Sequence, residues 1–297
     1  MKLAPRAVIT ALITTTAAAA ALLSASVPAL ASTTPPAPNP VLSGTWANTN
    51  PATSNIRDIV ITPSGKGIKV DGFGACEPTS CEWGNVRGTV FGTSVSSATG
   101  HSFEANWNFG FSRTVLLATE TRATFSLIPV LTVQEFTTFT DHSGRANFEV
   151  TETFVRTGKP IFPTHNGTAA FNYPLGASVS PALSLLGVWH NTSPTGGNIR
   201  TIVISLGPGG TLAVRAFGNC VPTLCAWGKV TGITFGTSIS SLTGRVFLAP
   251  YQFGFANKLV DGAVNAKGTR LTVQTYTEFT DHSGRSNYVT TDTFVRF

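Results

Sequence analysis

The pentapeptide Asp-His-Ser-Gly-Arg occurs twice, at residues 141–145 and 281–285, and contains the residue types of a catalytic triad. A triad needs its nucleophile, base and carboxylate to converge on one point, whereas neighbours in a tight turn point in different directions. A metal site at Asp141 and His142 would need further ligands, and the whole chain has 5 His. No pair of carboxylates recurs at matched positions in a preserved loop, which removes the usual argument for a glycosidase. We therefore predict no catalytic residues, no cofactor and no metal.

The residues of the same pentapeptide also suit a hairpin turn. Asp141 and Ser143 can cap turn amides, Gly144 can supply a positive φ, and Arg145 can pair with Asp141. A structural turn and a binding loop are both compatible with these residues.

Four cysteines form two pairs with the same spacing, Cys76 with Cys81 and Cys220 with Cys225. In an exported chain this pattern predicts two disulfides. Closing such a short loop stabilises the fold by roughly 2 kcal/mol in the loop-entropy model, which holds a turn but does not replace a core. One zinc site shared by the four thiolates is the alternative.

The first 31 residues are typical of a secretory signal peptide. Lys2 and Arg6 precede an uncharged run rich in Ala, Leu, Ile and Val, which ends on the small-residue motif Ala29-Leu-Ala31. An uncleaved membrane anchor is the alternative. We expect a mature chain from Ser32 that is secreted, extracellular and not inserted in a membrane.

The charge of the mature chain is mild. Removing Lys2 and Arg6 from 20 basic and 14 acidic residues leaves 18 − 14 = +4. The basic residues are scattered singly, so nucleic acid is not an expected partner.

The sequence after the signal peptide is a duplication. At a shift of 143 residues, 11 of the 18 positions from Gly44 to Ile61 are identical in the second copy. The cysteine block matches at a shift of 144 residues and the Asp-His-Ser-Gly-Arg block at a shift of 140. We divide the chain into a Pro-rich segment at 32–40, repeat 1 at 41–156, a linker at 157–184 and repeat 2 at 185–297.

Period-two alternation predicts an all-β fold. The clearest run places Phe103, Ala105, Trp107, Phe109 and Phe111 on one face of a strand. Further strands are predicted at 56–61, 68–73, 83–91, 131–140 and 146–156, with shorter ones at Trp46 and at 115–118. About eight strands joined by short turns favour an antiparallel up-and-down barrel for each copy, with a β-sandwich as the alternative.

The two ends of each copy resemble the avidin and streptavidin family and, more broadly, the calycin barrels that include the lipocalins. The resemblance lies in the opening Gly44-Thr-Trp-Ala-Asn48 and the closing Thr153-Phe-Val-Arg156. It implies that a basic residue of the last strand packs over the first Trp, pairing Trp46 with Arg156 and Trp189 with Arg296. It also implies a ligand-binding amide at Asn48 and Asn191. The loop before the last strand is shorter than in the family, and most of the tryptophans that enclose biotin have no match, so we expect a similar barrel with a different ligand or none.

The preserved loops are predicted to lie together. In a meander, the loops after strands one, three, five and seven share one mouth of the barrel, and the three best-preserved blocks fall there, whereas turns at the opposite end are expected to differ. Inward aromatic residues can equally well just fill the barrel. The candidate ligand-binding residues are Asn48, Arg57, Trp83, Trp107, Asp141, His142 and Arg145 in repeat 1, and Asn191, Arg200, Trp227, Tyr251, Asp281, His282 and Arg285 in repeat 2.

The leading hypothesis from sequence is a secreted binding protein that recognises a small molecule or a glycan at one mouth of each barrel, with duplication adding avidity. The second is a protein-interaction module, such as a secreted inhibitor or a surface structural protein. A hydrolase is the third and weakest.

Overall fold

The structure is a computed structural model that describes residues 37–38, 42–65, 67–122, 128–158, 161, 165–168, 179–193 and 198–296. The predicted signal peptide lies outside the described residues, as does much of the Pro-rich segment and of the linker. No described helix is long and apolar enough to cross a membrane.

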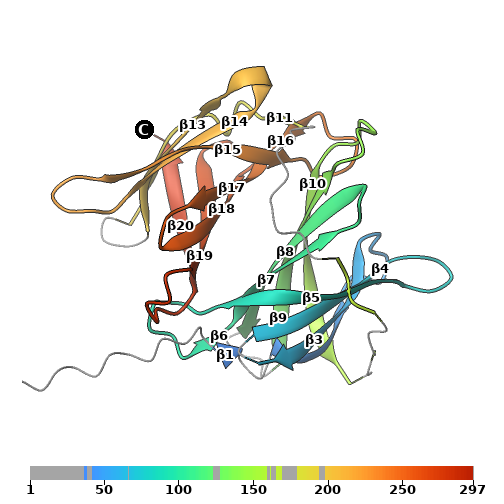
Figure 1. The fold of residues 1–297 in the computed structure, drawn as a ribbon. Helices are drawn as coiled ribbons and strands as arrows, with labels where there is room; N and C mark the ends of the chain where they lie inside the picture. Colours follow the sequence, from blue (N-terminus) through green and yellow to red (C-terminus); the bar gives the residue numbers. More distant parts are fainter. Residues whose placement is uncertain are drawn as a thin grey trace, which may run out of the picture. The chain divides into compact units, whose positions relative to one another are not determined.

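Repeat 1 forms a closed antiparallel barrel (Figure 1). Each strand pairs with the next one along the chain, and the last closes onto the first, so no crossover exists and the predicted meander is confirmed over the sandwich. Its strands are β2 (Gly44–Asn48), β3 (Ile56–Ser64), β4 (Gly67–Gly74), β5 (Cys81–Phe91), β7 (Ser102–Asn108), β8 (Ser112–Arg122), β9 (Pro129–Phe139) and β10 (Phe148–Thr157).

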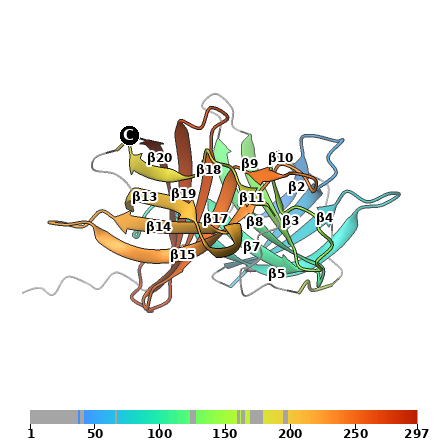
Figure 2. The same cartoon turned by 90° about the horizontal axis from the view of Figure 1, so that it is seen from above.

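Repeat 2 repeats this topology (Figures 1 and 2). The turn between its second and third strands contains the 3₁₀ helix η2 (Pro208–Gly210). Its strands are β12 (Gly187–Asn191), β13 (Ile199–Leu206), β14 (Leu212–Gly218), β15 (Cys225–Phe235), β17 (Val246–Gln252), β18 (Ala256–Val264), β19 (Arg270–Phe279) and β20 (Tyr288–Arg296).

In each repeat, a two-residue strand that precedes the barrel pairs in parallel with a two-residue strand between the fourth and fifth barrel strands. Strand β1 (Ala37–Pro38) pairs with β6 (Thr99–Gly100), and β11 (Ser180–Pro181) pairs with β16 (Thr243–Gly244). These strands were not predicted, because two residues carry no detectable alternation.

The interior of each barrel is filled by the apolar phase of its strands. Phe103, Ala105 and Trp107 are almost completely buried inside the first barrel, as the predicted aromatic face requires. At the end of that run Phe109 packs against the core, whereas Phe111 is 51% exposed.

The first Trp of each repeat is buried and anchored to the segment just before its own strand. The indole N–H groups of Trp46 and Trp189 donate to the carbonyls of Leu42 and Leu185 at 2.9 Å. The Arg296 guanidinium lies 4.4 Å from the centroid of the Trp189 ring. In repeat 1, Arg156 is opposite Trp46 in the strand register and donates to the Ser43 carbonyl.

A third apolar cluster joins the two barrels through outward-facing side chains. At its centre, the rings of Phe91 and Tyr276 are 5.2 Å apart, and those of Phe136 and Phe235 are 5.1 Å apart, both edge-on. The other members of the cluster are Val115, Leu117, Ile233, Leu248 and Leu259.

The contacts between the barrels follow a pseudo-twofold axis. Three backbone hydrogen bonds run in each direction between matched positions. Repeat 1 donates from Gly92 to Asn287, from Ala146 to Ile239 and from Glu149 to Gly236. Repeat 2 donates from Gly236 to Asn147, from Ser286 to Val95 and from Val289 to Gly92. The same surface of each copy therefore contacts its counterpart, as in an isologous dimer.

This interface corrects the expectation that turns opposite the predicted mouth differ freely. Residues 91–100 follow β5 at that opposite end and are identical to residues 235–244 at 8 of 10 positions. Backbone hydrogen bonds join each block to the loop before the last strand of the other repeat. The likeness of these blocks therefore has a structural cause, because the two surfaces must remain complementary.

Candidate ligand site at the barrel mouth

The antiparallel order places the loops after β2, β4, β7 and β9 at one end of the first barrel. The preserved blocks found in the sequence lie in three of these loops. The structure therefore places the preserved loops at one mouth, and their individual side chains can be examined in turn.

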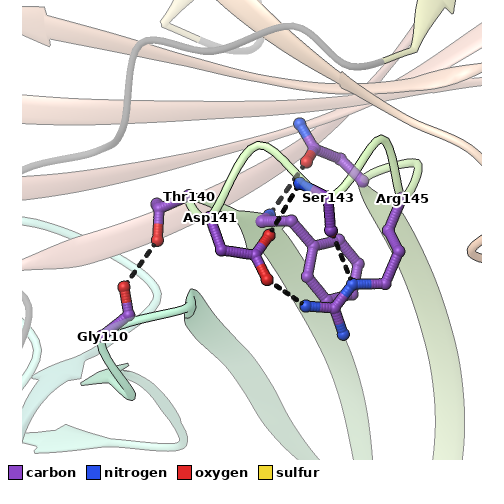
Figure 3. A network of polar contacts seen from close by, with 7 residues as sticks. Gly110, Thr140, Asp141, Ser143 and Arg145 are labelled. Carbon is purple, nitrogen blue, oxygen red and sulfur yellow. Dashed lines mark hydrogen bonds and ion pairs between the residues drawn. The ribbon is translucent and has the colours of Figure 1, made fainter.

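The loop of residues 141–145 is a self-contained polar network (Figure 3). One oxygen of Asp141 accepts the Ser143 N–H at 3.2 Å, and the other accepts Arg145 Nη2 at 2.6 Å. Arg145 Nε donates to Ser143 Oγ at 2.8 Å. The hydrogen bonds of Ser143 and the Arg145 charge hold the pKa of Asp141 below its ordinary value. Residues 281–285 repeat each of these bonds.

This network agrees with the interpretation of the loop as a hairpin turn. Gly144 has a φ of 75°, and the Arg145 guanidinium stacks 3.9 Å from the centroid of the Phe139 ring. Ser143 Oγ accepts from Arg145 Nε, and in the described part of the chain no hydrogen bond joins it to a histidine, so the triad residue types are not brought together there. His142 and His282 are exposed at the loop tips and hold positive φ angles of 55° and 54°.

The two asparagines at the ends of the first strands are engaged in local turns. Asn48 Nδ2 donates to the Ile56 carbonyl at 2.8 Å, and its oxygen accepts the Asn50 N–H at 2.9 Å. Asn191 makes the matching bonds to Ile199 and Ser193. Both ends of each amide are therefore occupied by the protein.

Arg57 and Arg200 contact different partners. Arg57 Nη2 donates to Glu77 Oε1 in the cysteine loop at 3.3 Å, whereas Arg200 Nη1 donates to the Ser193 carbonyl at 2.9 Å. The cysteine loops are closed by the predicted disulfides, Cys76–Cys81 and Cys220–Cys225.

Trp83 and Trp227 line the mouth as half-buried rings. Trp83 lies over β4, where a Cβ atom on Gly72 would come within 2.8 Å of its ring. It meets Trp107 edge-on at 5.6 Å, and Trp227 meets Tyr251 in the same way at 5.6 Å. Trp107 is fully buried and donates to the Gly84 carbonyl at 2.8 Å. Tyr251 donates to the Val214 carbonyl at 3.1 Å, and burial raises the pKa of its hydroxyl.

Three buried polar residues below the mouth of repeat 1 were missed in the sequence. Glu135, Thr137 and Thr114 point inward with Leu131 and Val133. Thr137 Oγ1 donates to Glu135 Oε1 at 3.2 Å, whereas Glu135 Oε2 has no hydrogen-bond partner among the described residues. Burial raises the pKa of Glu135 to about 7. The sequence did contain a signal for this site, because Glu135 places a charged residue where the alternation of the strand calls for an apolar one.

At the three matched positions of repeat 2, the buried ionisable side chain is a lysine instead of a glutamate. Thr275, Thr277 and Lys258 replace Glu135, Thr137 and Thr114 in that order, and all are buried.

The cation of repeat 2 lies beside an aromatic ring. Lys258 Nζ donates to Thr277 Oγ1 at 3.0 Å and lies 4.9 Å from the Trp227 centroid. Burial, with the Arg285 charge nearby, lowers the pKa of Lys258 to about 8. Thr275 Oγ1 has no partner among the described residues, as at the matched Glu135.

Comparison with known proteins returns no match, neither to a family model nor to a curated protein. Within the described ranges, no group of three or more His, Cys, Asp or Glu residues is placed to hold a metal ion.

Proposed function

We propose that this chain is a secreted binding protein whose two barrel mouths recognise a small polar molecule or a glycan. The observation that carries the proposal is the buried, unpartnered polar atom found at one matched position in both barrels, Glu135 Oε2 and Thr275 Oγ1. A buried polar atom without a partner costs about 1–3 kcal/mol, which a hydrogen bond from a ligand would offset.

The aromatic rims suit the same role. Trp83 with Phe109, and Trp227 with Phe253, form edge-on pairs at 5.3 and 5.6 Å, and Lys258 Nζ lies 4.9 Å from the Trp227 centroid. An aromatic ring next to hydrogen-bonding groups is the usual composition of sugar and small-molecule sites. Apolar side chains fill each barrel beyond Glu135 and Thr275, so the ligand would enter at the rim and reach these two groups once the rim side chains that bury them shift.

The difference between Glu135 and Lys258 predicts that the two mouths prefer different ligands. A ligand that offers hydrogen-bond donors suits repeat 1, and a ligand with a carboxylate suits repeat 2. The disulfides fit an extracellular protein. The resemblance to calycin barrels supports the same function.

An array of neutral and uronic-acid oligosaccharides tests the proposal, together with a library of small polar molecules. We expect neutral ligands to bind through repeat 1 and acidic ligands through repeat 2, with the charge-removing variants Glu135→Gln and Lys258→Met weakening each class separately. Absence of binding by the folded protein to both sets would reject the proposal.

The second function, a protein-interaction module, is favoured by a different observation. Strand β15 pairs with β17 only over Ile233–Phe235, so among the described residues its stretch around Gly228 and Lys229 has no neighbouring strand on that side.

A further inference from the structure

The linker completes the sheet of repeat 1. Strands β5 and β7 pair over Gly88–Phe91 and Ser102–Ala105, and they diverge toward the mouth. There Asn85 donates to the His165 carbonyl at 3.0 Å, and Gly167 donates to the Asn85 carbonyl at 2.8 Å. Asn108 of β7 donates to the Thr168 carbonyl at 2.7 Å. Residues 165–168 therefore act as a short strand parallel to β5.

The fit of this segment depends on two glycines and one carboxylate. A Cβ atom on Gly84 would lie 2.5 Å from the Gly167 nitrogen, and a Cβ atom on Gly167 would lie 2.8 Å from the Trp83 carbonyl oxygen. Glu82 accepts the His165 N–H at 3.2 Å and lies 3.3 Å from its ring Nδ1. Glycine in the segment and polar groups that face the Glu82 carboxylate are thus the features that the slot accepts.

Repeat 2 has the same divergence, and no described segment fills it. Strand β15 pairs with β17 over Ile233–Phe235 and Val246–Leu248 alone. Gly228 and Lys229 are exposed, whereas the matched Gly84 is buried and Asn85 is half-buried. A Cβ atom on Gly228 would meet nothing within 4 Å. No described loop or linker backbone is hydrogen-bonded to Lys229.

We propose that this edge of β15 binds an extended peptide segment of a partner protein, aligned parallel to β15 with a glycine facing Gly228. Addition of a strand to an open edge is a general mode of peptide recognition. The occupied slot of repeat 1 shows the geometry. This inference is independent of ligand binding at the barrel mouths.

The residues around the open slot indicate the chemistry of the partner. Ala226 replaces Glu82, and Lys229 replaces Asn85, so the carboxylate that pairs with His165 is lost and a cation is gained. An acidic residue is therefore expected where His165 lies in repeat 1. The cysteine loop that directly precedes β15 exposes Val221 (93%) and Leu224 (45%).

Titration of the intact chain with three synthetic peptides tests this proposal. The first, Pro-Thr-Asp-Asn-Gly-Thr-Ala-Ala, has the sequence of residues 163–170 with aspartate in place of His165. The second keeps the histidine, and the third combines the aspartate with valine in place of Gly167. Calorimetry should show one site for the aspartate peptide and affinities about tenfold lower for the other two.

Protein variants separate the slot from other surfaces. Lys229→Glu should reverse the preference between the aspartate and histidine peptides, and Lys267→Ala, which removes an exposed cation elsewhere, should leave it unchanged. Lys229→Pro removes the amide that the peptide would use and should abolish binding.

Equal affinity of the valine peptide, or no binding at about 1 mM by protein that is folded, would overturn the proposal. A dimer of the intact chain that excludes the peptide would also overturn it, because the slot would then hold a second copy.

Discussion

The side-chain amide of Gln134 in the first barrel donates a hydrogen bond of 3.0 Å to Asp261 in the second. Asp261 is buried among the rings that join the barrels, and its other oxygen has no partner among the described residues. Leu117 holds the matched position in repeat 1, so at this position the pseudo-twofold interface has an apolar side chain on one side of its axis and a carboxyl group on the other.

Asp261→Asn should change how stability depends on pH. Burial raises the pKa of Asp261 from 3.8 to about 7, so the folded state binds this proton more tightly than the unfolded state. The resulting stability is fully present below pH 3.8 and is lost as the pH rises to about 7.

Urea unfolding between pH 4 and 8, followed by tryptophan fluorescence, measures this effect. Above pH 7 the Asn variant should be more stable than the parent by about 1–3 kcal/mol, and the difference should shrink toward pH 4. Glu135 and Asp71 also have raised pKa values, so part of the slope remains. Curves that stay parallel across this range would show that Asp261 titrates normally.

Repeat 1 expressed alone as residues 41–156 should fold and self-associate. It has its own closed barrel and core, but it would expose Phe91 and Phe136 to water. Because the interface is isologous, a second copy of repeat 1 can replace repeat 2. Sedimentation should show a dimer, and Phe136→Ser should return it to a folded monomer. An unfolded product would mean that the copies depend on a shared core.

Gly167→Val should displace the linker from β5. The new side chain would collide with the backbone at Trp83 and Gly84, and overpacking of this kind costs about 1–3 kcal/mol. Proteolysis of the linker should become faster, and the edge of β5 should lose protection from hydrogen exchange. Gly158→Val is the matched control, because a Cβ atom there meets nothing within 4 Å. Equal behaviour of the two variants would argue against a strand role for the linker.

His142 tests whether the preserved loop is only a structural turn. Its φ of 55° is unfavourable for a side chain that is branched at Cβ. Thermal unfolding should show that His142→Val destabilises by about 1–2 kcal/mol, whereas His142→Gly does not. If a ligand is found whose binding His142→Gly abolishes at unchanged stability, the loop has a binding role as well.

Much of the fold was predictable from the sequence, because alternation along Phe103–Trp107 and the duplicated ends specify inward faces and strand order locally. The interface between the barrels was not predictable, because in the sequence Phe91 and Phe136 look like ordinary strand residues. Their role as contacts is seen only in the structure of both barrels. The site was predictable only in part. Asn48 and Asp141 do lie at the mouth but are hydrogen-bonded within the protein, whereas Glu135 follows Leu131 and Val133 at the inward-facing positions of its strand and was not recognised as a site residue.

The most direct test of the central claim, ligand recognition at the barrel mouths, is a fluorescence titration with neutral gluco-oligosaccharides and with oligogalacturonides. Trp46, Trp107 and Trp189 are fully buried, so shifts should arise from the half-buried Trp83 and Trp227. We predict saturable shifts, with Trp83→Phe removing the response to the neutral sugars and Trp227→Phe removing the response to the acidic ones. Titrations without any shift, or shifts that persist in the Trp83→Phe, Trp227→Phe double variant, would contradict the claim.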